Sequence, residues 1–114
     1  HIYPLGGKAK SVKKNASAFS YREAKFVHVI PAMFPDAADF EKNKAWVREY
    51  WEALHPHSAG GAYVNFLHND EGEDRVATAY RDNYKRLVSL KNKYDPANMF
   101  RFNQNIKPTA KVKK

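Results

Sequence analysis

The sequence contains no cysteine, which excludes disulfides, thiolate metal sites and a cysteine nucleophile. No apolar stretch approaches the roughly 18 residues that a membrane-spanning helix needs, and no basic segment leads into an apolar core of the signal-peptide kind. We therefore expect no membrane partner. Localisation stays open, because both a cytoplasmic and a secreted protein fit these absences.

Motifs that complete an active site are also missing. The five histidines show no H-E-x-x-H or comparable ligand spacing, so no metal site is predicted. No serine stands in a G-x-S-x-G turn, and the pair Gly6-Gly7 is too short for a phosphate-binding loop. We expect the chain to be inactive by itself.

The net charge of +8 lies entirely in the two end segments, while residues 15–106 are balanced. Basic ends are typical of solubilising termini, and no aromatic residues alternate with basic ones as a base-stacking surface requires. We therefore expect no nucleic-acid partner, although an anionic partner stays an alternative. The excess consists of Lys8, Lys10, Lys13, Lys14, Lys107, Lys111, Lys113 and Lys114.

Hydrophobic periodicity predicts an α+β fold. The β-forming residues favour strands over 1–5, 24–34 and 61–67. Apolar spacing of three and four predicts an amphipathic helix from an N-cap at Asp36 to about residue 54, and further helix over 73–93 in one or two pieces. The strand over 24–34 is apolar enough to be covered on both faces. We expect Phe100, Phe102 and Ile106 to anchor the segment that follows.

The predicted sheet is too small for its aromatic content. Three strands are few for a sheet buried on both faces, and the chain carries seven tyrosines, seven phenylalanines and two tryptophans. Both observations indicate a piece of a larger protein.

A polar pair interrupts the predicted strand over 61–67. Because side chains alternate along a strand, Tyr63 and Asn65 share one face while Val64 and Phe66 share the other. One interpretation is that the polar pair is half exposed beside a protein core. The other is that it faces a flat heterocyclic ligand, to which Asn65 could offer a donor and an acceptor and Tyr63 a proton-transfer group. His28, within the strand over 24–34, is interpreted as a core or pocket histidine.

The stretch over 80–106 resembles the C-terminal segment of the berberine bridge enzyme-like family of FAD-linked oxidases. The similarity lies in N-Y-K-R-L at 83–87, K-N-K-Y-D-P-A-N-M-F-R at 91–101 and Q-N-I at 104–106. Upstream, the chain is similar to that family at P-L-G-G (4–7), S-A-F-S-Y-R (17–22), W-V-R-E-Y-W-E-A-L-H-P (46–56) and G-G-A-Y-V-N-F (60–66).

This resemblance implies a role for each candidate residue. Tyr63 matches a tyrosine that lies over the flavin and serves as, or assists, the catalytic base. Asn65 and Asn83 match cofactor-binding positions, and His28 matches a strand that contacts substrate. The implied reaction is oxidation of an alcohol or amine, with hydride transfer to FAD and reoxidation by oxygen.

The same resemblance implies partners and a division of the chain. Residues 1–72 would belong to a substrate-domain sheet with its helix, and residues 73–114 would pack on an N-terminal FAD-binding domain or chain, which holds the pyrophosphate loops. The other implied partner is a small-molecule substrate. The alternative is a free-standing, non-catalytic binding module whose lysine-rich ends contact an anionic partner.

Two positions depart from the family pattern. Phe66 replaces a residue that is often Tyr or His, which removes a polar substrate contact. Arg81 stands where a glycine is common, so the turn before Asn83 is expected to change.

Overall fold

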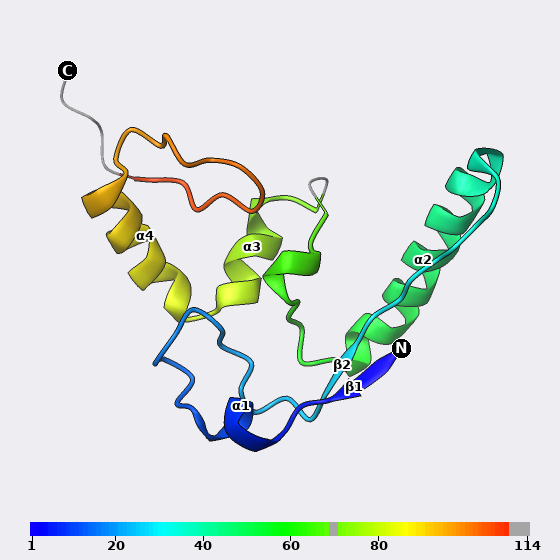
Figure 1. Ribbon diagram of the computed structural model, residues 1–114, viewed down its shortest axis with the longest axis horizontal. Coiled ribbons are helices and arrows are strands. Elements are labelled where there is room, and N and C mark those ends of the chain that lie inside the picture. The colour runs from blue at the N-terminus through cyan, green and yellow to red at the C-terminus, as the bar shows by residue number, and fades with distance from the viewer. Residues whose placement is uncertain (69–70, 110–114) are drawn as a thin grey trace. The chain divides into compact units, whose positions relative to one another are not determined.

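The chain divides into two compact units that are described separately. The computed structural model describes residues 1–68 and 71–109. The first unit comprises His1–Lys10 and Glu23–Gly60, and the second comprises Ser11–Arg22 and Gly61–Lys114. Figure 1 shows their helices and the short strand pair, which confirm the predicted α+β class.

The first unit holds a two-stranded antiparallel ribbon. Strand β1 (Ile2–Pro4) pairs with β2 (Phe26–His28), so that Ile2 lies opposite His28. A short helix, α1 (Gly7–Ser11), follows β1. The strand predicted over 24–34 is thus much shorter than expected, because β1 gives it only three residues to pair with. Its expected burial is also wrong for Phe26, which is 62% exposed, and for His28, which is exposed.

The long helix of the first unit follows the predicted pattern. The Asp36 side chain accepts a 2.9 Å hydrogen bond from the Ala38 N–H and caps a 3₁₀ turn, Ala37–Asp39. This turn leads into α2 (Phe40–Leu54), which is a single uninterrupted helix in Figure 1. No residue of α2 is buried. Its aromatic face, which includes Trp46, Tyr50 and Trp51, is 39–50% exposed, as expected for a face that needs a covering surface.

The second unit contains two helices joined by a tight turn. Helix α3 (Glu73–Tyr80) precedes α4 (Asn83–Tyr94), so the predicted helix over 73–93 forms in two pieces. Val76 and Ala79 of α3 pack with Leu67 in a small core, with Val64 and Tyr84 beside them. The core is small because each of the two helices offers only a short apolar stripe.

The predicted strand over 61–67 is wrong. Residues Val64–Phe66 form a 3₁₀ turn, closed by hydrogen bonds from Phe66 N–H to Tyr63 O (2.9 Å) and from Leu67 N–H to Val64 O (3.2 Å). A strand needs a neighbouring strand to satisfy its backbone groups, and in the described residues the sheet consists of β1 and β2 alone. The backbone of this stretch therefore bonds locally.

Tyr21 ties three separate stretches of the second unit together. Its hydroxyl donates a 2.9 Å hydrogen bond to Thr78 O at the end of α3, and the Arg81 guanidinium lies 3.8 Å from the ring centroid. Gly61 passes so close that a Cβ there would lie 1.8 Å from Cζ of the ring. Tyr21 is 7% exposed. The loop over 17–22 is thus fixed to both the 60–66 stretch and the α3–α4 turn.

Asp95 organises the chain where α4 ends. Its carboxylate accepts hydrogen bonds from the backbone N–H groups of Met99 (2.7 Å) and Phe100 (3.0 Å) and from the Lys91 ammonium group. Lys91 also donates to Phe100 O. The bond from Lys91, with the two backbone donors, lowers the pKa of Asp95 below its usual value. The K-x-x-x-D-P-x-N-x-F pattern thus describes a polar turn.

The segment after this turn runs back past α3, as Figure 1 shows. Gln104 Nε2 donates a 2.6 Å bond to Leu67 O, and Asn92 exchanges two hydrogen bonds with Thr109. Phe100 and Phe102 are 78% and 86% exposed, so the prediction that they anchor the segment is wrong within the described chain, whereas Ile106 is partly buried. Polar contacts hold this segment instead.

Replacing Gly61 by alanine is expected to destabilise the second unit. The new methyl group would overlap the Tyr21 ring, and overpacking of this kind costs about 1–3 kcal/mol. The free energy of unfolding, measured with urea, should fall by that amount. Gly6→Ala is the matched control, because a Cβ at Gly6 has no heavy atom within 4 Å. Equal stability of the two variants would contradict the close packing.

Replacing Asp95 by asparagine should destabilise the protein at neutral pH. The folded-state pKa of Asp95 is lowered, so its ionised form stabilises the fold above the usual value of 3.8 and loses this effect as the pH falls below it. The difference in melting temperature between wild type and variant should therefore be largest near pH 7 and shrink below about pH 4. Asp39→Asn is the control, since Asp39 makes no side-chain cap hydrogen bond. A pH-independent difference would contradict the assignment.

Candidate functional site

Tyr63 and Asn65 meet at the start of the 3₁₀ turn. Tyr63 keeps an extended backbone, with φ −81° and ψ 115°, and the turn begins at the next residue. Asn65 Nδ2 donates a 2.8 Å hydrogen bond to Tyr63 Oη. The two predicted site residues are therefore brought together, although by a turn and not by a shared strand face.

The tyrosine of this pair is held among aromatic rings but open to its surroundings. Tyr63 is 43% exposed. Phe19 packs against it edge to face, with ring centroids 6.2 Å apart, and Phe66 does the same at 5.3 Å. Such contacts orient a ring without covering its hydroxyl. The phenolic oxygen of Tyr63 therefore combines a fixed position, an amide donor and access from outside.

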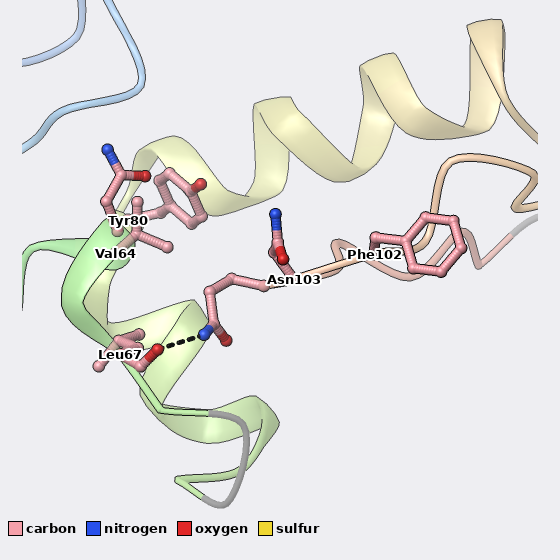
Figure 2. A pocket seen from close by; sticks show the side chains of 7 residues that line it. Val64, Leu67, Tyr80, Phe102 and Asn103 are labelled. Atoms are coloured by element: carbon pink, nitrogen blue, oxygen red, sulfur yellow. Dashed lines mark hydrogen bonds between the residues drawn. The ribbon is translucent and has the colours of Figure 1, made fainter.

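Asn65 also borders a hollow of about 450 Å³, which is within the size range of small-molecule sites. Figure 2 shows the residues around it: Val64 from the 3₁₀ turn, Leu67 directly after that turn, Tyr80 from the end of α3, and Phe102 and Asn103 from the C-terminal segment. The lining includes no charged side chain. Its residues are Val64, Asn65, Leu67, Tyr80, Phe102, Asn103 and Gln104.

The two tyrosines near this hollow differ in their chemistry. Burial raises the pKa of Tyr80 above its usual value of 10, so Tyr80 holds its proton and acts as a hydrogen-bond donor or acceptor. Tyr63 instead is 43% exposed, and its hydroxyl accepts the amide N–H of Asn65. Of the two, Tyr63 is the better candidate for accepting a proton.

Asn83 has surroundings that its sequence motif did not indicate. Its side chain is 8% exposed, and Nδ2 lies 2.8 Å from Lys14 O, 3.0 Å from Ser17 O and 3.4 Å from Ala18 O. One turn further along α4, Arg86 donates to Asn15 O at 3.4 Å. The N-Y-K-R-L motif thus holds the loop over 14–18, a contact between residues more than 60 positions apart that no local pattern reveals.

His28 belongs to the first unit. Its ring packs edge to face on Tyr50, with centroids 5.6 Å apart. Both residues line a second hollow of about 350 Å³, together with His1, Val29, Ile30, Pro31 and Trp46. His28 is therefore a surface pocket residue in the described chain, and its predicted contact with substrate stays a prediction.

Arg81, in the turn between α3 and α4, has a backbone conformation that is typical of glycine. Arg81 has φ 49° and ψ −131°, a region that side-chain-bearing residues rarely adopt. Its N–H is bonded to Ala77 O at 2.9 Å and to Thr78 O at 3.3 Å, and its carbonyl accepts from Tyr84 N–H at 3.0 Å. Backbone hydrogen bonds thus close the tight α3–α4 turn, and Arg81 is held over Tyr21.

Charge and metal-binding potential add little to the site. Lys14 pairs with Asp82 at 3.5 Å and Lys107 pairs with Glu73, whereas Lys111, Lys113 and Lys114 lie outside the described residues. In residues 1–68 and 71–109, no cluster of His, Asp or Glu could hold a metal ion. Within the same ranges no helix has the length and apolarity to cross a bilayer.

Comparison with known proteins shows what this chain is similar to. Residues 62–107 match the family model described as "Berberine and berberine like". The chain is 30% identical over 105 residues to an FAD-linked oxidoreductase of Dictyostelium discoideum, covering 91% of this chain and 22% of that protein. It is 28% identical over 121 residues to tetrahydroberberine oxidase of Berberis wilsoniae, covering 92% of this chain and 23% of that enzyme.

A bacterial relative gives a similar match. The chain is 27% identical over 124 residues to the aclacinomycin-N/aclacinomycin-A oxidase of Streptomyces galilaeus, covering 94% of this chain and 23% of that enzyme. The chain thus spans less than a quarter of the length of these relatives, which are named as oxidases or as an FAD-linked oxidoreductase.

Proposed function

We propose that this chain supplies part of the substrate pocket and of the flavin surroundings in a complete enzyme. In this proposal it is the berberine-like segment of a berberine bridge enzyme-like FAD-linked oxidoreductase. The observation that carries the proposal is the hydrogen bond between Asn65 and Tyr63. It joins a possible proton acceptor to an amide in a stretch that belongs to the family match.

The residues of the pair fit a flavin. The isoalloxazine ring presents hydrogen-bond donors and acceptors along its edge. Asn65 is exposed, and within residues 1–68 and 71–109 its side-chain oxygen accepts no hydrogen bond while one N–H is used by Tyr63. Asn65 therefore keeps both an acceptor and a donor for a heterocycle. The uncharged lining of the adjoining hollow also suits a neutral ring system.

The remainder of the FAD must be held by other residues, because the chain carries no glycine-rich pyrophosphate loop. When bound, FAD supplies the redox chemistry by accepting a hydride from the substrate, and oxygen reoxidises it. Tyr63 accepts the proton of a substrate hydroxyl or amine group. Asn65 orients the Tyr63 hydroxyl with its N–H.

Exposed apolar side chains support the assignment to a larger protein. In the described residues only four apolar residues form the buried core, whereas sixteen large ones are exposed. The end of α4 and the turn after it expose Tyr94, Met99, Phe100 and Phe102 by 71–86%. We assign this surface to contact with an FAD-binding domain, as predicted for residues 73–114.

The predicted boundary at residue 72 separates a part assigned to the substrate domain from a part assigned to contact with the FAD-binding domain. Within the described chain, residues 11–22 and 61–68 pack with α3 and α4, so compactness alone does not divide it there. A substrate-domain role for residues 1–72, including substrate contact by His28, stays part of the proposal.

The proposal predicts that flavin binding requires more than this chain. The isolated chain should purify without the visible absorption bands of oxidised flavin, whereas a complete protein containing it should bind FAD. A colourless complete protein, reconstituted with excess FAD, would refute the assignment. Intact mass measured on both samples controls for truncation.

The role of Tyr63 is tested by replacing it with phenylalanine in the complete protein. The variant keeps the aromatic packing with Phe19 and Phe66 but loses the proton acceptor. We expect FAD content to stay unchanged and kcat to fall by roughly 10²–10⁴-fold, which is the usual contribution of a general base. Tyr3→Phe is the matched control, because Tyr3 is 53% exposed on β1 and lines neither hollow. Unchanged turnover in Tyr63→Phe would remove the residue from catalysis.

A further inference from the structure

We infer that Asn83 is a positioning residue for Tyr63, acting through the loop over 14–22, and not a ligand of the cofactor. The inference rests on the proposed function, because it concerns how the base proposed there is held. Its observations are the buried amide of Asn83, the three carbonyl groups around it and the aromatic contact that this loop makes with Tyr63.

The amide nitrogen of Asn83 is fully used by the protein. A side-chain amide has two N–H donors, and Nδ2 of Asn83 faces three backbone carbonyl oxygens at 2.8–3.4 Å. No donor is left on this nitrogen for a bound molecule. Since the side chain is only 8% exposed, releasing it to a ligand would leave carbonyl groups of the loop without their partner.

The loop that Asn83 holds leads directly to the site. Phe19 follows Ala18, whose carbonyl is one of the three acceptors, and its ring packs edge to face on Tyr63. Arg22 lies over the same Phe19 ring, 4.8 Å from its centroid, and donates a 2.7 Å hydrogen bond to Ser17 Oγ. The loop is thus closed on itself around Phe19 while Asn83 fixes its backbone.

A second anchor fixes the other end of the loop. Tyr21 is bound to Thr78 O and packed against Gly61, two residues before Tyr63. The start of α4 and the end of α3 therefore hold the loop from both ends, and Phe19 lies between these anchors. This arrangement leaves Phe19 little freedom, so a change at Asn83 should reach Tyr63 through one aromatic contact.

Asn83→Asp tests the inference, because it keeps the side-chain shape but turns the donor nitrogen into an oxygen that faces three carbonyl groups. In the complete protein, amide hydrogen exchange over 13–22 should speed up by about tenfold, while FAD content and flavin absorption stay as in wild type. We expect kcat to fall about tenfold with KM within about twofold of wild type, because a displaced base affects the chemical step more than binding.

The matched control is Asn43→Asp. It makes the same chemical change on α2, where the amide donates one hydrogen bond to Asp39 O, and it should leave both kcat and exchange over 13–22 unchanged. A second variant, Phe19→Leu, removes the ring but no backbone anchor, so it should lower kcat without loosening the loop. The double variant Asn83→Asp with Phe19→Leu should be no slower than the slower single variant, since both act on one contact.

The outcomes separate the two possible roles of Asn83. Loss of FAD or a shifted flavin spectrum, with exchange over 13–22 unchanged, would make Asn83 a cofactor ligand and overturn the inference. The inference would also be overturned if the falls in kcat of the two single variants multiplied in the double variant. Unchanged turnover in Phe19→Leu would overturn it as well, and this result tests the inference even if Asn83→Asp does not fold. A wild-type complete protein without FAD would instead refute the proposed function, while exchange over 13–22 still reports whether Asn83 holds the loop.

Discussion

The second unit depends on the packing of one buried aromatic ring. Tyr21 is bonded through its hydroxyl to the end of α3, lies beneath the Arg81 guanidinium and approaches the backbone at Gly61. Three stretches that are far apart in the sequence, around residues 20, 61 and 80, therefore meet at a single side chain. Any side chain at position 61 would displace the ring, and with it the loop that contacts Tyr63. This explains in physical terms why the S-A-F-S-Y-R and G-G-A-Y-V-N-F stretches occur together in one chain.

Arg81 shows how a local cost can be offset by a contact. A residue with a side chain in an unfavourable backbone region costs about 1–3 kcal/mol, and a glycine at this position would avoid that cost. The guanidinium group, however, lies 3.8 Å from the Tyr21 ring centroid, and a cation–π contact of this kind contributes about 0.5–2 kcal/mol. Arg81 thus adopts a strained backbone conformation, and its contact with the Tyr21 ring offsets part of that cost.

Local patterns predicted the helices well and the strands poorly. The N-cap at Asp36, the helix to Leu54 and the two pieces of helix over 73–94 depend on residues close in sequence, so periodicity and capping are sufficient to find them. Strands depend on partner strands, and in the described chain the short ribbon offers none to residues 30–34 and 61–67. The motifs drew attention to Asn83 and to the turn at Asp95, but they did not indicate the contacts that these residues make. Asn83 binds backbone carbonyl groups of a loop far away in the sequence, and Asp95 binds backbone N–H groups a few residues further on. Both contacts depend on how the chain turns, so the local sequence does not predict them.

The absence of the predicted strand and the hydrogen bond between Asn65 and Tyr63 have one cause. In an extended strand, residues i and i+2 lie about 6.6–6.8 Å apart along the chain, so their side chains run parallel and a phenol and an amide need not meet. Here the chain turns immediately after Tyr63, and the tightened backbone brings Asn65 Nδ2 to 2.8 Å from Tyr63 Oη. The hydrogen bond is thus produced by the departure from the strand. A neighbouring strand that drew residues 63–67 into a sheet would extend this stretch and remove the turn that brings Asn65 Nδ2 to Tyr63 Oη.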